Sequence, residues 1–467
     1  MAGWTTLREL VREEFKQSLE EGKDPGKVDA LRPAYEAASE DEDALAKVHR
    51  QLLALPVRDD FPFEEPSGLD SIRALRTNDQ RTWELSIDDD QLYDKLYGAW
   101  LGRCAGCALG KPAEQLMTRL QLAHIGNSWE LQKKYLVAVS ADEWPIRDYF
   151  PAHSPAEPET GPLDWGKGSF RETIAHMETD DDIRYTVLGQ QILTDYGRDF
   201  RSCNVANRWL GLGYTFFCTA ETQAYRNYVI RGDGFRNPAR EPDLDQTADW
   251  EFYTHHQNPY REWIGAQIRV DSYAYAAPGN PQLAAEYAWR DARISHVKNG
   301  IYSAMFCSAI IAAAFATSDV HEIIAAGLAE IPATSRLHAE LLQTIAICKK
   351  YECNFEHFEA VFTELHALLG HYHYVHSNNN TALCVVALLL SNGDFHQGIT
   401  LAVMGGWDTD CNGATVGSVV GAITGAKLAP KLWVDRLNDT LRAGLLGYDP
   451  IAISECARRS LHIARKD

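Results

Sequence analysis

The sequence predicts an all-α protein, a compact orthogonal bundle of crossing helices, and three stretches support this prediction. Glycine recurs at every fourth position in two places, with Gly98, Gly102, Gly106 and Gly110 in one run and Gly413, Gly417, Gly421 and Gly425 in the other. Between them, apolar residues follow helical spacing from Ile183 to Leu193. Glycine costs about 0.5–1 kcal/mol against alanine inside a helix, so repeated glycines indicate a packing requirement. We therefore expect the two glycine-striped helices to cross at a shared core.

Residues 1–85 are predicted to form an acidic, helical N-terminal extension. Helix-like runs cover Thr5–Glu21 and Lys27–Leu55, and the Pro- and acid-rich segment Pro56–Pro66 ends the region. Packing or dimerisation is the preferred role, with a regulatory partner-binding arm as the alternative. Residues 86–467 are expected to form one large domain with long insertions at about residues 130–170 and 211–280.

Both insertions contain residues that suit substrate binding. Five prolines between Trp144 and Lys167 forbid a continuous helix there. The aromatic residues of this loop are either a wall for a planar substrate group or ordinary surface packing. In the second insertion, Arg226, Arg261 and Arg269 could grip phosphate through their planar guanidinium groups. They could equally be structural ion-pair partners in so acidic a chain.

Composition limits the partners and the compartment. The formal net charge of −20 argues against nucleic acid or a polyanionic polymer as the main partner. The uncharged stretch from Gly300 to Ser318 is rich in alanine and serine, so a buried bundle helix is preferred to a membrane span. The first fifteen residues carry charges rather than the apolar core of a signal peptide, and the ten cysteines then suit a reducing, cytoplasmic compartment. We expect no membrane partner.

Two groups of carboxylates stand at predicted helix starts. Asp408 and Asp410 follow a Gly-Gly pair. Side chains two positions apart can converge on one point only where a turn enters a helix. The other group precedes the apolar run from Ile183 to Leu193 and contains Thr179, Asp180, Asp181 and Asp182. If the two groups converge, each like-charged pair near 4 Å is repelled by about 4 kcal/mol at a dielectric of 20, so a hard divalent cation or protonation must relieve it. The alternative is that each group only caps its own helix.

Two further patterns could indicate zinc but have simpler interpretations. Cys104 and Cys107 have the spacing of one half of a zinc site, yet no second cysteine pair accompanies them. We expect them to be small buried side chains. His371, His373 and His376 are close in sequence, but no second cluster joins them, so a loop at a helix start beside the pocket is preferred.

The stretches Gly106–Glu114, Thr179–Asp181 and Asp408–Asp410, in that order, resemble the three motifs of the ADP-ribosylglycohydrolase family, which includes dinitrogenase reductase-activating glycohydrolase. The likeness spans about residues 90–460. It implies an all-helical fold with two magnesium ions between its central helices, for which Mn²⁺ or Ca²⁺ can substitute. It also implies hydrolysis of the bond joining ADP-ribose to a protein side chain or small acceptor, and it favours the metal site over helix caps.

The resemblance implies a role for each matching residue. Thr179, Asp180, Asp181, Asp408 and Asp410 match the metal ligands. Glu114 matches the acidic residue that reaches the substrate or its attacking water, and Glu114, Asp181 and Asp408 are the expected catalytic groups. Asn299 and Gly300 resemble an Asn-Gly loop near the nucleotide, and His376 and Trp407 complete the expected substrate contacts.

Four departures from the family pattern stand out. Asp182 and Cys411 occupy positions where the family commonly has threonine, and each is a candidate metal ligand or neighbour of one. A thiol is a poor ligand for a hard cation. The 65 positions from Glu114 to Thr179 form a longer segment than expected, and no basic residue follows the Asn-Gly loop where one is expected. Two alternatives therefore remain, a hydrolase of free N-ribosides such as a nucleoside or nucleotide, and a non-catalytic, crystallin-like member.

Overall fold

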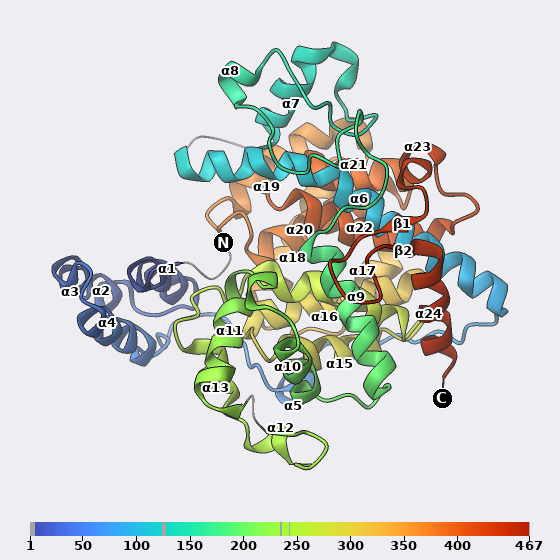
Figure 1. The fold of residues 1–467 in the computed structure, drawn as a ribbon. Helices are drawn as coiled ribbons and strands as arrows, with labels where there is room; N and C mark the ends of the chain where they lie inside the picture. The colour runs from blue at the N-terminus through green and yellow to red at the C-terminus, as the bar shows by residue number, and fades with distance from the viewer. Residues whose placement is uncertain (1–4, 124–127, 234–235, 242, 467) are drawn as a thin grey trace.

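The computed structural model describes residues 5–123, 128–233, 236–241 and 243–466. Helices dominate these residues, and a two-stranded antiparallel sheet pairs Thr440 with Ala452 (Figure 1). The predicted all-α class is confirmed.

The helices are given in chain order, with 3₁₀-helices labelled η. The first third contains α1 (Leu7–Glu20), α2 (Pro25–Asp29), α3 (Arg32–Ala38), α4 (Glu42–Ala54), α5 (Leu69–Ala74), α6 (Asp89–Ala123), α7 (Ser128–Val139), η1 (Ala141–Glu143) and α8 (Glu157–Thr160). The middle contains α9 (Asp181–Tyr196), α10 (Ser202–Leu210), η2 (Tyr214–Phe216), α11 (Thr219–Ile230), α12 (Leu244–Thr247), α13 (Trp250–His255), η4 (Ile264–Arg269), α14 (Asp271–Tyr275) and α15 (Pro281–Ala292).

The last third completes the bundle. It contains α16 (Lys298–Ala314), α17 (Val320–Leu328), α18 (Arg336–Lys350), η5 (Phe355–His357), α19 (Phe358–Leu369), α20 (Ser377–Ser391), α21 (Phe395–Met404), α22 (Thr409–Thr424), α23 (Lys431–Val434), η6 (Asp435–Leu437) and α24 (Ile453–Arg465), with β1 (Thr440–Leu441) and β2 (Ile451–Ala452) ahead of α24.

The centre of the fold is the contact between α6 and α22. A Cβ atom added to Gly102 would lie 2.0 Å from the carbonyl oxygen of Gly417, and one added to Gly106 would lie 1.9 Å from that of Gly413. No side chain fits at these positions, so the two backbones touch directly. The prediction that the two glycine stripes meet is confirmed.

The apolar stretch that begins at residue 300 forms α16, a helix inside the bundle. Every residue from Asn299 to Ala314 is buried, as expected for a helix surrounded by other helices. Within the described ranges, none of the helices has the length and apolarity needed to span a bilayer.

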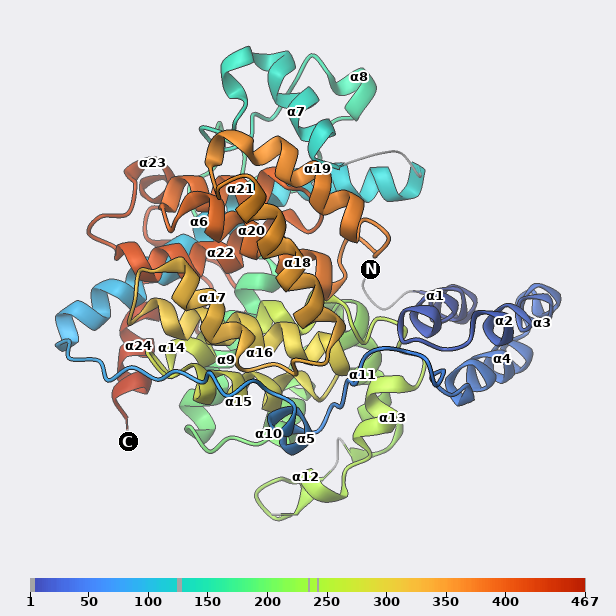
Figure 2. The ribbon, with the colours of Figure 1, turned by 180° about the vertical axis from the view of Figure 1, so that it is seen from behind.

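Helices α1–α4 form a small unit at one side of the bundle (Figures 1 and 2). Its own core contains Val11, Phe15, Leu45 and Leu52. A different face of α1 docks on the bundle, where Leu10 packs with Tyr260 and Trp263. The extension is therefore an ordered element of the fold. The division at residue 85 remains a prediction.

Candidate metal centre

Three helices bring the acidic residues to one place. Asp180 is the N-cap of α9 and Asp408 the N-cap of α22, while Glu114 lies on α6 one turn beyond Gly110. The Thr409 hydroxyl donates a 2.7 Å hydrogen bond to the carbonyl of Gly110, which fixes the start of α22 against α6. Just before it, Gly406 and Trp407 have φ values of 83° and 56°. This left-handed turn directs Asp408 and Asp410 towards α6. It is the turn into a helix that the sequence predicts at this position.

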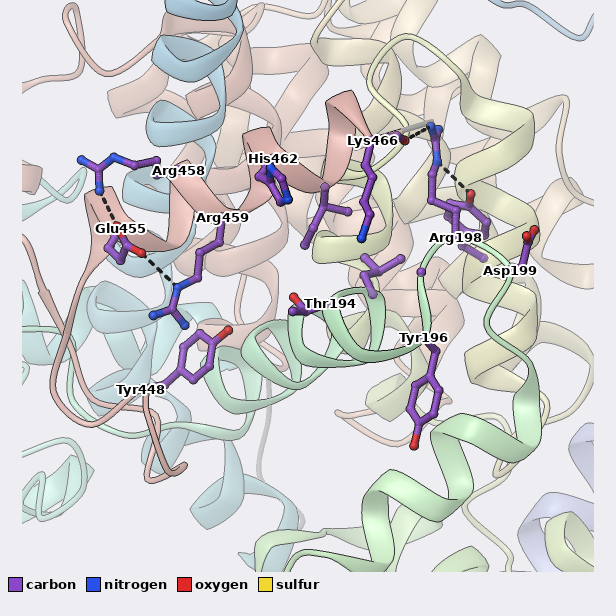
Figure 3. Close-up of a pocket in the computed structure, with 14 residues that line it drawn as sticks. Thr194, Tyr196, Arg198, Asp199, Tyr448, Glu455, Arg458, Arg459, His462 and Lys466 are labelled. Atoms are coloured by element: carbon purple, nitrogen blue, oxygen red, sulfur yellow. Dashed lines mark hydrogen bonds and ion pairs between the residues drawn. The ribbon is translucent and has the colours of Figure 1, made fainter. Parts of the chain in front are cut away.

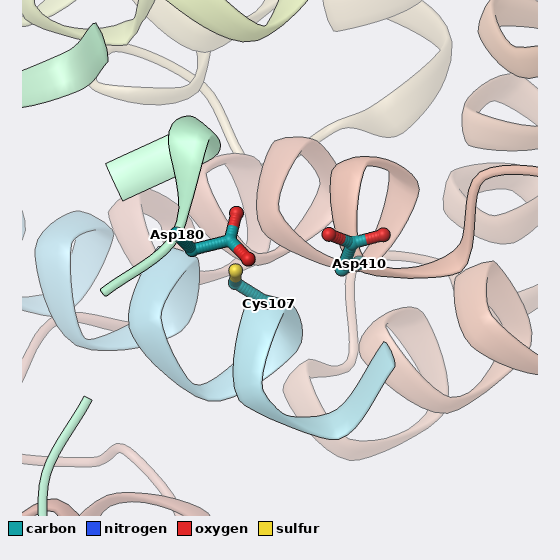
Figure 4. Close-up of side chains that lie close together, drawn as sticks. All are labelled: Cys107, Asp180 and Asp410. Atoms are coloured by element: carbon teal, nitrogen blue, oxygen red, sulfur yellow. The ribbon is translucent and has the colours of Figure 1, made fainter. Parts of the chain in front are cut away.

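The carboxylates from the two motifs converge on Asp410. Four groups of side chains have ligand atoms that all lie within 4.8 Å of one another. They are Glu114 with Asp408 and Asp410; Cys107 with Asp180 and Asp410; Asp182 with Asp410 and Cys411; and Asp180 with Asp181 and Asp182. Figure 4 shows the Asp180 carboxylate next to the Cys107 sulfur, with Asp410 facing them from α22.

Asp180 also fulfils the alternative role of a helix cap. Its Oδ1 accepts a 3.0 Å hydrogen bond from the backbone N–H of Asp182, and its Oδ2 lies 3.1 Å from Nζ of Lys111. The Lys111 ammonium lowers the pKa of Asp180, although burial alone would raise it. Both oxygens of this carboxylate therefore have partners in the protein. Capping and membership of the acidic cluster occur together at this residue.

Asp182 lies deeper, at a buried ion pair. Arg103 donates to its Oδ1 at 3.0 Å and lies 2.9 Å from Asp271 on α14. All three side chains are fully buried. The other oxygen of Asp182, Oδ2, has no hydrogen-bond partner, and neither does Oδ1 of Asp410. A buried carboxylate oxygen without a partner is unfavourable, so these two atoms mark a place that fits a cation.

The remaining carboxylates are electrostatically strained. Burial, followed by the charge of Asp180, raises the pKa of Asp410 to about 7. Burial and neighbouring carboxylates also raise the pKa values of Glu114, Asp181 and Asp408 above the usual range. Protonation relieves this repulsion in the metal-free protein. A divalent cation would relieve it while keeping the carboxylates ionised, and oxygen donors in this number suit Mg²⁺, Mn²⁺ or Ca²⁺.

Thr179 lies at the exposed rim of the cluster. Its hydroxyl accepts a 3.1 Å hydrogen bond from Arg184. Its carbonyl oxygen accepts another from Lys111. The structure therefore places it beside the predicted ligands, with its side chain held by a cation of α9.

Sequence reasoning missed several residues around the cluster. Cys107, expected to be only a small buried side chain, is one of the groups near Asp410. Asn380 accepts hydrogen bonds from the backbone of Asp408 and from Asn412, at 3.1 and 2.7 Å. Tyr374 lies near Glu114, and the charge of Glu114 adds to burial in raising its pKa. No local pattern identifies these residues, except that Asn380 belongs to a run of three asparagines.

The expected substrate contacts at Asn299 and Gly300 are wrong for this structure. Asn299 is fully buried, and its amide donates to Glu65 and Glu262 at 2.9 and 2.8 Å while accepting from the backbone of Leu337. A Cβ at Gly300 would lie 2.6 Å from a backbone carbonyl, so this glycine serves close packing. Arg336 donates to the same two glutamates, which closes the network.

His376 and Trp407, the other two expected contacts, are also packed inside the protein. The His376 ring is fully buried, stacks on Tyr372 at 4.1 Å and lies 3.8 Å from Glu20 of the extension. Trp407 stacks on His366 at 4.2 Å and is 4% exposed. His376 adjoins the centre through its carbonyl, which accepts from Asn380. These side chains build the walls behind the centre rather than an open binding face.

Arg261 and Arg269, two of the three arginines considered in the second insertion, are structural. Arg261 makes ion pairs with Glu14 and Glu21 of the extension, and Arg269 pairs with Glu221 and Asp291. Arg261 is fully buried and Arg269 is 1% exposed. The ion-pair alternative is therefore correct for both, and neither is available to grip a phosphate.

The proline-rich insertion contributes one aromatic residue beside the centre. The backbone N–H groups of Asp164 and Trp165 donate to the side chain of Gln115, the neighbour of Glu114. The Trp165 side chain is 43% exposed. Trp144 instead packs against Phe358 of α19, and Tyr149 and Phe150 are buried. Among these four aromatic residues, Trp165 is the one with an exposed side chain, and its backbone is held against α6 at Gln115.

A separate surface pocket of about 790 Å³ lies at the far end of α9 (Figure 3). Its charged residues are largely paired, since Arg458 and Arg459 contact Glu455, and Arg198 donates to the carbonyl of Lys466. It contains none of the clustered aspartates of the metal centre. The pocket is therefore not the site that the motifs describe.

Comparison with known proteins identifies one matching family. The model of a family described as ADP-ribosylglycohydrolase matches residues 88–462. A search of curated proteins gives no match. Among solved structures, one described as an ADP-ribosylglycohydrolase-related protein complex is similar over 80% of this chain and 99% of its own, with 18% identity and a TM-score of 0.48.

Proposed function

The chain belongs to the ADP-ribosylglycohydrolase family, and from this premise we propose that it is a magnesium-dependent hydrolase that cleaves the ribosyl glycosidic bond of an ADP-ribosylated protein or small molecule. Family membership supports glycohydrolase activity in general. The observation that carries the specific proposal is the convergence of Glu114, Asp408 and Asp410 within 4.8 Å, beside the aspartates at the start of α9.

The carboxylates form two candidate metal positions. Asp408 and Asp410 would present oxygens to one ion, and Asp180, Asp181 and Asp182 would border the place of a second. Thr179 stands at the rim. The all-oxygen side suits Mg²⁺, with Mn²⁺ or Ca²⁺ as substitutes. When bound, such an ion polarises substrate oxygens and lowers the pKa of a coordinated water.

Glu114 is the candidate proton donor. Burial and the nearby aspartates raise the pKa of its carboxyl well above the usual range, which favours its protonated form. A protonated carboxyl next to a glycosidic bond can deliver that proton to the departing atom of the acceptor. The ionised carboxylates around it then stabilise the positive charge that develops on the ribose ring. Asp181, which is half-buried, is the candidate for that role.

A second candidate function is hydrolysis of a free N-riboside. The specific observation behind it is that Asn299, Arg261 and Arg269 are all committed to buried networks, so these groups offer no diphosphate contact. The exposed ring of Trp165 could stack on a free base at the rim. A nucleoside needs no diphosphate site.

A substrate panel separates these functions. Metal-stripped protein is supplied with Mg²⁺ and assayed for release of ADP-ribose from ADP-ribosylated arginine, serine and protein, and for release of base from nucleosides and nucleotides. Release of ADP-ribose supports the first function, and release of free base supports the second. If neither substrate class is cleaved while both metal positions are filled at millimolar Mg²⁺, the non-catalytic alternative is correct.

The Asp408→Asn variant tests whether any activity found belongs to this centre. It should abolish turnover while leaving the helical circular dichroism unchanged, because the side chain is nearly isosteric. Retained turnover would show that the reaction occurs elsewhere on the protein.

We further propose a reducing, cytoplasmic setting with small-molecule or ADP-ribosylated substrates as partners. All ten cysteines are free in the structure, which suits a compartment that keeps thiols reduced. The net charge of −20 disfavours nucleic acid as a partner.

A further inference from the structure

A thiol lies beside two carboxylates that each have one buried oxygen without a hydrogen-bond partner. The Cys411 sulfur and one oxygen each of Asp182 and Asp410 lie within 4.8 Å of one another. These three residues are 5%, 0% and 4% exposed. Asp182 Oδ2 and Asp410 Oδ1 are both buried without a hydrogen-bond partner. The same three residues thus combine a sulfur, two carboxylates with one unpaired oxygen each, and exclusion from water.

The neighbouring position at Asp180 differs in this respect. Both oxygens of Asp180 are occupied, one by the Asp182 N–H and the other by Lys111. A cation drawn to this side of the centre therefore gains more from Asp182 and Asp410 than from Asp180. That position brings it within reach of the Cys411 sulfur.

From this geometry we propose that the second position of the metal centre, bounded by Asp182, Asp410 and Cys411, binds a divalent cation of intermediate softness, represented by Zn²⁺, with the Cys411 thiolate as a ligand. This inference rests on the metal centre of the proposed function. It assigns Cys411 a role as a ligand and distinguishes the two metal positions from each other.

The donor set agrees with known preferences. Thiolate ligands favour Zn²⁺ over Mg²⁺, while carboxylates accept either ion. Tetrahedral zinc bonds of about 2.0–2.3 Å put ligand atoms roughly 3.5 Å apart, which is inside the observed span. Three protein ligands leave a fourth position open, as in catalytic zinc sites.

Binding changes the protonation of the sulfur. In the metal-free protein the Cys411 thiol is protonated and hydrogen-bonds to Asp408. On coordination the S–H bond breaks, a sulfur–metal bond forms, and the proton leaves to solvent, so each bound ion releases one proton from Cys411. The competing view is that Cys411 acts only as this hydrogen-bond donor and binds no metal.

Cobalt is the probe that distinguishes the two views. Metal-stripped protein is titrated with Co²⁺ in a constant concentration of Mg²⁺, and the near-ultraviolet thiolate-to-cobalt charge-transfer band is recorded. We expect the band to appear, to saturate at one Co²⁺ per chain and to disappear when Zn²⁺ displaces the cobalt. Absence of the band in the wild-type protein, with or without bound Co²⁺, would overturn the proposal.

Substitutions then identify the sulfur. The Cys411→Ser variant should lose the band and bind Co²⁺ and Zn²⁺ about tenfold or more weakly. The Cys411→Thr variant should lose the band too, and should bind Mg²⁺ more tightly because a hard oxygen replaces the sulfur. Having two variants guards against one that fails to fold.

Two cysteines of a different helix, α6, serve as comparisons. Cys104 is buried one turn from Cys107 and belongs to none of the four groups, so Cys104→Ser should retain the band. Cys107→Ser should retain it as well. Loss of the band in Cys107→Ser, with retention in Cys411→Ser, would assign the sulfur ligand to α6 and overturn the proposal.

The outcome is independent of catalysis. A cobalt band together with failure of every glycosidic substrate would leave the metal site standing and remove the proposed function. Mg²⁺-dependent turnover without any cobalt band would do the reverse.

Discussion

Nζ of Lys111 lies 3.1 Å from Oδ2 of Asp180, so one of the expected metal ligands already has a cation supplied by the protein. The lysine side chain is 17% exposed and the aspartate 7%. The pair is therefore shielded from solvent, and its electrostatic effect is correspondingly strong.

Replacing this lysine tests its competition with the metal. Lys111→Met removes one positive charge from the cluster, so Mg²⁺ affinity measured by calorimetry should increase several-fold. The metal-free protein should lose about 2–4 kcal/mol of unfolding free energy, because Asp180 stays buried without its partner. The exposed Lys47→Met serves as the control and should change neither quantity. Weaker Mg²⁺ binding in Lys111→Met would mean that the lysine supports the ion instead.

The contact between α6 and α22 predicts a severe effect of one methyl group. In Gly417→Ala the new Cβ would lie 2.1 Å from the Gly102 carbonyl oxygen, so the helices must separate. We expect a loss of about 3 kcal/mol or more in urea unfolding, at the high end for overpacking, with weaker metal binding. Gly68→Ala is the matched control, since its nearest neighbour would be 3.9 Å away. Equal stability of the two variants would show that the helices are not in backbone contact.

The pKa of Asp410 predicts how the stability of the metal-free protein depends on pH. The folded-state pKa of about 7 lies above the unfolded value, so the folded protein binds the proton more tightly. This contribution is fully present below about pH 4 and is lost as the pH rises through 7. In EDTA, urea unfolding should show the wild type losing stability relative to Asp410→Asn between about pH 5 and pH 8.

Added Mg²⁺ should reverse that trend in the wild type. The ion binds ionised carboxylates, so the stabilisation it gives should be larger at the higher pH. A pH-independent difference between wild type and Asp410→Asn in EDTA would show that this aspartate titrates normally.

Glu114 should control the rate rather than the fold. Glu114→Gln keeps the shape but cannot donate a proton, so kcat/KM should fall about 10²–10⁴-fold. The wild-type rate should decline as the pH rises through the raised pKa of Glu114, and the variant should lose that decline. Substitution of the exposed Glu84 by Gln should leave both properties unchanged. A wild-type pH profile in Glu114→Gln would exclude the proton-donor role.

Asn299 should affect stability rather than substrate binding. Its fully buried amide donates to Glu65 and Glu262, so Asn299→Ala should cost about 1–3 kcal/mol of unfolding free energy. The KM of the folded variant should match that of the wild type. Asn78→Ala, at an exposed position, is the control. A raised KM with normal stability would restore Asn299 to the substrate site.

The parts of the structure that were predictable from sequence are those encoded by regular spacing. Glycine at every fourth position determines which helix faces can touch, so the meeting of Gly102 with Gly417 could be expected. The acidic centre was predicted because three motifs resemble those of the ADP-ribosylglycohydrolase family; the two helix starts alone left capping as the alternative. Its convergence on Asp410 is now described by distances.

What could not be predicted depends on contacts between distant parts of the chain. Nothing near Asn299 in the sequence shows that Glu65 returns to it, 234 residues away. The pairing of Lys111 with Asp180 and of Arg103 with Asp182 is likewise decided by how three helices meet. Cys107 is buried, as predicted, but its nearness to Asp180 and Asp410 depends on the helix contact and could not be seen in the sequence.

The buried ion pairs of Arg261 with Glu14 and Glu21 have a consequence for the synthesis of the protein. Its partner Glu14 precedes it by 247 residues, so a ribosome completes α1–α4 long before the arginine emerges. Until then the acidic face of α1 must remain hydrated. The small N-terminal core can form early, but its attachment to the bundle is necessarily a late step, and a nascent chain interrupted before residue 261 carries an undocked, negatively charged appendage.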